Sequence, residues 1–167
     1  MYHTIREFED DWTRDVERTL IVLDNIPDNA LSQSVADGHR TLGRIAWHLA
    51  TTIPEMMAHT GITLEVISED TPMPPSSKDI RHAYEVVSRM LLQKIKQSWT
   101  DETLEKEDDL YGEKWPRKVT LQVLVHHQIH HRGQMTVLMR QAGLKVPGMF
   151  GPSKEDWVEF GMEPPEM

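Results

Sequence analysis

Histidines are the strongest candidates for chemistry in this chain, and they gather in one short segment. The 167 residues include nine histidines, and four of them fall within six positions at His126, His127, His130 and His131. On a helix, residues four apart differ by only about 40° around the axis, so their rings project from consecutive turns. The segment therefore contains two pairs, His126 with His130 and His127 with His131, and either pair could share a metal ion. Cysteine is absent, so such an ion would be bound by His, Asp or Glu.

The two pairs point about 100° apart, and the helical wheel moderately favours His127 with His131 as the pair that faces the core. The His127 and His131 direction also collects three larger core-type side chains, namely Leu124, Met135 and Leu138. The direction of the other pair gathers Val119, Val123 and Val137, so it is partly apolar too. Histidines at the surface or hydrogen-bonded at the margin of a core would show the same spacing, and this alternative stays open.

A stable site needs a third ligand, and His48 is the candidate. It lies beside Ile45 and Thr52, at the border of the apolar face of its helix. Glu55 and Gln134 are candidates for a general base or for a partner that orients a ligand. Glu55 could equally be a solvated carboxylate, and Gln134 a structural hydrogen-bonding group.

Four segments with a helical period must position these side chains. Apolar residues recur at spacings of three and four over residues 4–26, 41–59, 78–99 and 119–142. Pro54 lies inside the second segment and is expected to bend or split it. Amphipathic helices of this length bury their apolar stripes against one another. The sequence therefore predicts an all-α fold, a four-helix bundle.

The segments between the helices are expected to be loops. Residues 70–77 are rich in proline, residues 62–67 could be a strand or an apolar loop, and residues 100–118 read as a charged connection. A tail follows Gly143, with a short helix that Ser153 would begin. Arg132 points about 100° from His131, and we expect it to face solvent, a partner subunit or the tail. The tryptophans are expected in the core or an interface; the four considered are Trp47, Trp99, Trp115 and Trp157.

At HHQIHHRGQM, and upstream at LGRIAWHLATTIPEM, the sequence resembles the DinB/YfiT-like superfamily of helical-bundle metalloproteins. The resemblance covers most of the chain. It implies a four-helix bundle of DinB/YfiT-like type with a short C-terminal tail. It also implies the metal ligands His48, His127 and His131, with His126 and His130 as neighbours. Relatives imply a homodimer, a role in the stress response, and reactions that use a low-molecular-weight thiol.

Composition limits the classes of partner. With 38% apolar and 27% charged residues, the chain reads as one ordinary globular domain over residues 1–167. Its net charge of -9 disfavours nucleic acid and an anionic membrane surface as partners. The chain has neither a signal-peptide pattern nor an apolar run long enough for a membrane span, so we expect a cytoplasmic protein.

Two functions follow as hypotheses. Three neutral imidazoles suit zinc or nickel and leave a position open for a substrate. The first hypothesis is a metal-dependent enzyme, a thiol-dependent transferase or a hydrolase, acting on a small molecule. The alternative is a non-catalytic metal-binding stress-response protein, in which the metal is structural. A third interpretation is that the histidines bind no metal.

Overall fold

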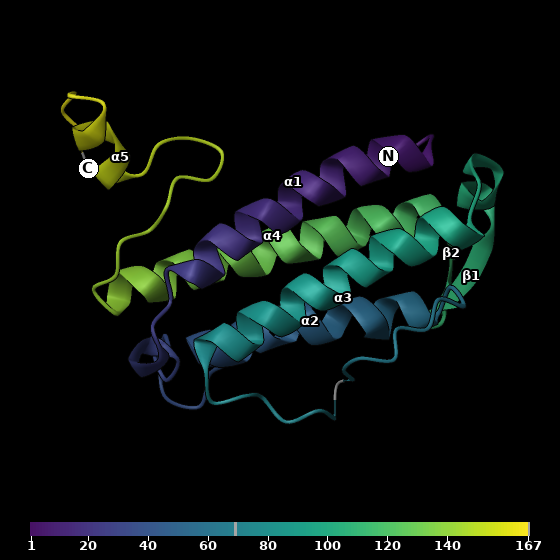
Figure 1. Cartoon of the computed structure of the whole chain (residues 1–167), viewed down its shortest axis with the longest axis horizontal. Helices are drawn as coiled ribbons and strands as arrows, with labels where there is room; N and C mark the ends of the chain where they lie inside the picture. The colour runs from purple at the N-terminus through teal and green to yellow at the C-terminus, as the bar shows by residue number, and fades with distance from the viewer. Residues whose placement is uncertain (69, 167) are drawn as a thin grey trace.

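A computed structural model describes residues 1–68 and 70–166 of the chain. Four long helices form an elongated bundle, which confirms the predicted fold (Figure 1). Their bounds are α1 Ile5–Asp24, α2 Leu42–Ala58, α3 Ser77–Ser98 and α4 Arg117–Gln141. In the described ranges, no helix has both the length and the apolar character that crossing a membrane requires.

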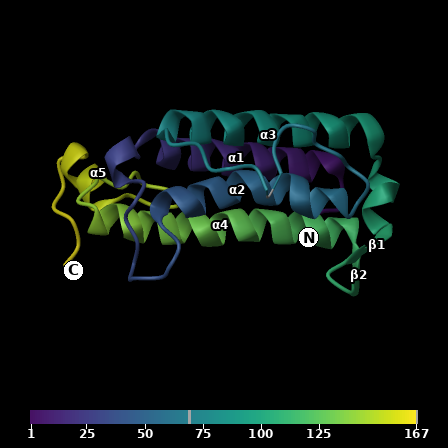
Figure 2. The same ribbon diagram turned by 90° about the horizontal axis from the view of Figure 1, so that it is seen from below.

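The four helices form a ring in which each helix packs against two others. Helix α1 contacts α3 and α4, and α2 contacts the same two helices. Consecutive helices in the chain, α1 with α2 and α3 with α4, therefore lie across the diagonals of the bundle (Figure 2). As a result α4 has two buried sides, one toward α1 and one toward α2.

Local sequence sets where the helices begin and end. Thr4 caps α1 by accepting a hydrogen bond from the backbone of Glu7, whose side chain accepts from the Thr4 backbone in return. Thr41 accepts a hydrogen bond from the Arg44 amide and begins α2. Gly143 follows α4 with a positive φ of 73°, as a helix-ending glycine does. Pro54 does not split α2, which continues through it to Ala58.

The bundle encloses one large apolar core. Its most deeply buried large side chains include Phe8, Trp12, Trp47, Leu49, Tyr84 and Leu91. Trp99 is also buried, whereas Trp115 and Trp157 are partly exposed. Each long helix thus contributes an apolar stripe, as the spacing of its residues predicts.

The connection between α3 and α4 has more structure than the sequence predicted. A short 3₁₀ helix, η2 (Asp101–Glu105), precedes a hairpin of β1 (Glu107–Leu110) and β2 (Glu113–Pro116). The two turn residues, Tyr111 and Gly112, both have positive φ, 54° and 87°, which suits a tight two-residue hairpin turn. Five of the eight strand residues are charged and apolar residues do not alternate along either strand, which is why period-two patterning did not reveal them.

The remaining segments are short. A 3₁₀ helix, η1 (Asp28–Ala30), lies between α1 and α2. Residues 62–67 form a loop with a single isolated bridge between Glu65 and Ile67. The tail contains α5 (Lys154–Glu159), which Ser153 caps as predicted. This short helix stands at the end of the bundle opposite the hairpin (Figure 1).

Candidate metal site

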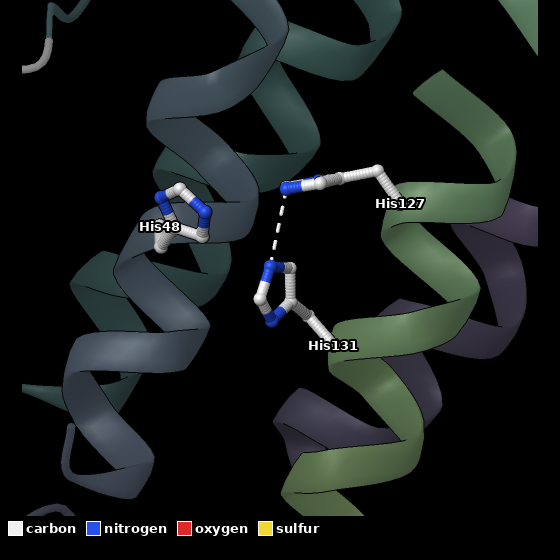
Figure 3. Close-up of side chains that lie close together, drawn as sticks. All are labelled: His48, His127 and His131. Atoms are coloured by element: carbon white, nitrogen blue, oxygen red, sulfur yellow. Dashed lines mark hydrogen bonds between the residues drawn. The ribbon is translucent and has the colours of Figure 1, made fainter. Parts of the chain in front are cut away.

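Three histidines from two helices meet at the facing surfaces of α2 and α4. His48 projects from α2, and His127 and His131 project from consecutive turns of α4 (Figure 3). One ring nitrogen from each residue lies within 4.8 Å of the other two. The Nε2 atoms of His127 and His131 are 3.1 Å apart. These are the three residues that the sequence motif implies, and the structure brings them together.

The arrangement fits a metal ion that binds imidazole nitrogen. Two nitrogens at about 2.0–2.1 Å from one tetrahedral ion lie roughly 3.3 Å from each other. The separation of 3.1 Å between His127 and His131 is close to that value. The wider limit of 4.8 Å for the full group means that the His48 ring must move slightly inward to complete the set. The donor set could therefore hold a divalent ion.

Gln134 determines which nitrogen of His131 carries the proton. The Nδ1 atom of His131 lies 2.7 Å from Gln134 Oε1, which can only accept a hydrogen bond. His131 is therefore protonated at Nδ1 in its neutral form, and its Nε2 lone pair faces His127. In the metal-free chain the 3.1 Å hydrogen bond then has His127 Nε2–H as its donor. A metal ion would need the other tautomer of His127.

The other two rings have different surroundings. Thr52 donates its hydroxyl hydrogen to the His48 carbonyl oxygen at 2.7 Å, and its oxygen lies 3.2 Å from Nδ1 and 3.5 Å from Nε2 of His48, so it can accept from the nearer Nδ1–H. That hydrogen bond leaves Nε2 of His48 as the ligand atom. In the described ranges, Nδ1 of His127 is buried and has no hydrogen-bond partner. A buried polar atom without a partner destabilises the folded chain by about 1–3 kcal/mol.

The surroundings keep all three rings neutral. Burial lowers the pKa of His48 and of His127 from 6.5 to about 4, and the Arg40 charge acts in the same direction. Burial also lowers the pKa of His131, while its hydrogen bond to Gln134 opposes the shift. Neutral imidazole is the form that binds metal ions. Lowered pKa values beside a cleft are also typical of functional sites.

Gln128, which the sequence analysis did not single out, aligns the two helices at the site. Its side chain is fully buried, and Nε2 donates a hydrogen bond of 3.2 Å to the Leu49 carbonyl oxygen. The residue after His127 is thus joined to the residue after His48. The sequence signal that could have revealed Gln128 is its position in the core-facing row of α4. It is a polar residue seven positions from both Leu121 and Met135.

The position of Arg132 differs from the one predicted from the sequence. Arg132 was expected to face solvent, a partner subunit or the tail, but only 2% of its side chain is exposed. Its guanidinium contacts Asp15 Oδ1 at 2.6 Å and Thr19 Oγ1 at 2.7 Å, both on α1. The prediction was wrong because α4 has a second buried side toward α1, about 100° from the side that carries His131.

Glu55 lies in a different group of contacts. Both of its carboxylate oxygens accept from the Tyr111 hydroxyl at 2.9 Å, and His59 Nε2 lies 3.7 Å away. These contacts join α2 to the hairpin, at the end of the bundle where the turn of Tyr111 lies. Gln134, by contrast, contacts His131 directly.

The two neighbouring histidines lie outside the group of three. His126 and His130 are both exposed. His130 Nε2 lies 3.1 Å from Gln134 Nε2, so the amide bridges His130 and His131. The structure therefore orients the His127 and His131 pair, rather than the His126 and His130 pair, toward α2.

A pocket of about 540 Å³ opens beside His131. One wall comes from α4 and the other from the loop that precedes α2, which crosses α4 in Figure 2. Its lining combines four apolar residues, Val35, Ile45, Val137 and Leu138, with polar ones that include His39, Arg40 and Gln134. A small molecule in this pocket would reach the histidine group from the side of His131.

Comparisons with known proteins agree with the fold and the motif. The family model described as DinB family matches residues 1–166. The Bacillus subtilis (strain 168) protein YrdA is 41% identical over 167 residues, which are the full length of both chains.

Two solved structures are similar. A DinB-like protein from Bacillus cereus ATCC 10987 has a TM-score of 0.86 and 45% identity, covering 90% of this chain and all of its own. A DinB-like protein from Bacillus subtilis, YjoA, has a TM-score of 0.68 and 16% identity, covering 88% of this chain and 99% of its own. At that identity the second likeness shows the fold alone.

Proposed function

This chain belongs to the DinB family, and from that premise we propose that it is a divalent-metal-dependent enzyme acting on a small molecule. The observation that carries the proposal is the convergence of three neutral imidazoles, with 3.1 Å between two of their Nε2 atoms. Zinc and nickel suit this donor set best. The ligands of the proposal are His48, His127 and His131.

Two features of the site that destabilise the metal-free protein support a functional role. The fold keeps the three rings in a partly buried cluster where their protonation is disfavoured. It also leaves Nδ1 of His127 buried without a partner in the described part of the chain. Both features destabilise the metal-free protein, and they are typical of sites where function opposes stability. Binding of an ion at the Nε2 atoms would offset the first of these, whereas Nδ1 of His127 would stay without a partner among the described residues.

Catalysis is favoured over a structural role by the shape of the site. Within the described ranges, the group of potential ligands has three members, not the four of a closed structural site. The pocket beside His131 gives the open position access to a substrate. An ion bound there would lower the pKa of a coordinated water or thiol, or polarise a carbonyl group.

The chain's own residues would then prepare the site. Gln134 holds the proton on Nδ1 of His131, so that Nε2 stays available as a ligand. Val137 and Leu138 line the approach with apolar surface, which limits access of water to a bound substrate. We propose a thiol-dependent transfer as the reaction, with a low-molecular-weight thiol as co-substrate, because relatives in this superfamily imply it. A hydrolase is the second reaction that the same donor set allows.

Cobalt(II) in place of the native ion tests the proposal, because its visible spectrum reports coordination. We expect 2-mercaptoethanol, cysteine or glutathione to change the spectrum of the wild-type protein and of a His126→Ala control. His127→Ala should lose the cobalt spectrum. A cobalt spectrum that no thiol, water exchange or small anion alters would instead identify a closed, structural ion and favour the non-catalytic alternative.

We also propose that the protein forms a homodimer through its tail. Four large apolar residues there are exposed, namely Phe150, Val158, Phe160 and Met162. Exposed apolar residues gathered in one segment are typical of an interface. Sedimentation of wild type and Phe160→Ser tests this: a dimer that the substitution weakens supports the proposal, and a monomer in both contradicts it.

A further inference from the structure

An arginine side chain lines the pocket beside His131. Arg40 lies in the loop that precedes α2 and lines the pocket with His39 and Gln134. In the described ranges the Arg40 guanidinium forms no ion pair or hydrogen bond, whereas Arg117 and Arg132 are each paired with a carboxylate. A chain with a net charge of -9 thus keeps this cation at the pocket beside His131 without a carboxylate partner in the described ranges.

Arg40 lies on the same side of the site as the histidine group. Arg40 and His131 line the same pocket, so an anion paired with Arg40 would lie beside His131. A divalent ion at the histidines would add more positive charge to the same region. The site therefore favours a ligand that brings negative charge.

The N-terminus of α2 does not supply a competing anion site. The Leu42 amide donates to the Gln33 carbonyl oxygen, the Gly43 amide to the Leu31 carbonyl oxygen, and the Arg44 amide to the Thr41 hydroxyl. These backbone donors are therefore already used. An anion in the pocket would be held by the Arg40 side chain.

Apolar surface surrounds the cation. Val35 and Val137 both line the pocket, yet they are 58% and 54% exposed. Two exposed valines on the two walls, with Ile45 and Leu138 also in the lining, favour a ligand that has an apolar part. Neither a bare inorganic anion nor a purely polar molecule would use this surface.

We propose that the pocket binds an organic anion, whose acid group pairs with Arg40 and whose apolar part lies between Val35 and Val137. The inference rests on the proposed function, because it names the class of substrate that would reach the metal ligands. Arg40 is then the residue that determines specificity for charge, and Val137 the residue that determines specificity for apolar bulk.

Titration of the zinc-saturated full-length protein with three probes, followed by amide NMR shifts, tests the inference. Hexanoate carries both features, hexanamide lacks the charge and acetate lacks the apolar chain. We expect hexanoate to bind about tenfold more tightly than either other probe, with the largest shifts at Gly38 and Val137. Arg40→Gln should remove the preference over hexanamide, and Val137→Ser should reduce the preference over acetate.

Arg44→Gln is the matched control, because it removes the same charge near His48 without altering the pocket lining. It should keep both preferences. Equal affinity for hexanoate and hexanamide in the wild type would overturn the inference. So would an equal loss of the preference for hexanoate over hexanamide in Arg40→Gln and Arg44→Gln. The same titration on metal-free protein separates the two proposals: if no metal binds, the proposed function fails, and the hexanoate preference still decides the role of Arg40.

Discussion

Gln128 of α4 donates a hydrogen bond of 3.2 Å to the carbonyl oxygen of Leu49 on α2. Each of the two residues directly follows a histidine of the metal site, so this contact sets the register of the two helices where the ligands meet. The other end of the amide, Oε1, is buried without a partner in the described chain. Gln128 therefore serves alignment more than stability.

Replacing Gln128 by methionine should separate these two roles. Methionine has a similar volume and removes both the hydrogen bond and the unpaired oxygen, so the free energy of unfolding should change by less than about 1.5 kcal/mol. Metal affinity should fall about tenfold, because the helices lose their fixed register. Urea unfolding and metal titration measure the two effects, with exposed Gln141→Met as control. Unchanged metal affinity would contradict the alignment role.

The buried ion pair of Arg132 and Asp15 joins α4 to α1 directly beside the site. Arg132→Met should destabilise the protein by about 3–5 kcal/mol, because it leaves the Asp15 carboxylate buried and unpaired. The double variant Asp15→Leu with Arg132→Met should recover most of that loss. Arg140, also on α4, forms a more exposed pair with Glu155 of α5, and Arg140→Met should lose at most about 1 kcal/mol. Similar losses in the two single variants would refute this account.

Gln134 should matter for metal binding more than for folding. Gln134→Ala removes the acceptor that keeps the proton on Nδ1 of His131, so metal affinity should fall about tenfold or more. Gln134→Glu keeps an acceptor in place and should retain most of the affinity. Competition with a chelating dye measures both, and Thr136→Ala, whose exposed hydroxyl donates to the Gly133 carbonyl oxygen on its own helix, is the control. A loss in Gln134→Glu as large as in Gln134→Ala would argue against orientation of His131.

Acid should destabilise the metal-free protein through its buried histidines. His48 and His127 have a pKa of about 4 in the folded chain, against 6.5 ordinarily. The unfolded chain therefore binds protons more tightly, so the free energy of unfolding falls as pH decreases from about 6.5 toward 4. His127→Gln removes one such group and should gain stability relative to wild type between pH 7.5 and pH 5.

Urea unfolding with a chelator present, at the two pH values, measures that difference. His126→Gln, at an exposed position, is the matched control. Its free energy of unfolding relative to wild type should change less between the two pH values than that of His127→Gln. The same relative stability of His127→Gln at both pH values would show that burial does not disfavour protonation of His127.

The sequence predicted features that depend on local periodicity. Apolar spacings of three and four located the ends of all four helices to within two residues, and Ser153 correctly marked the start of α5. The spacing of His127 and His131 indicated a shared direction, since it depends only on helix geometry. The family motif was needed to choose between the two histidine pairs and to supply His48.

Features that depend on how the helices pack could not be read in this way. Arg132 is buried because α4 has neighbours on two sides, and a single helical wheel does not show which helix lies in which direction. Glu55 shares a side of α2 with His48 on the wheel, yet the hairpin supplies its partner Tyr111 from 56 residues away. The hairpin was missed because its charged strands lack apolar alternation, although Gly112 marks the turn.

Metal content measured on purified variants tests the central claim most directly. Elemental analysis of the wild type should find one divalent ion per chain at the three-histidine group. His48→Ala, His127→Ala and His131→Ala should each lose the ion while keeping the helical circular dichroism spectrum, and His126→Ala should retain it. Loss of the ion from His126→Ala together with its retention in His127→Ala would contradict the account.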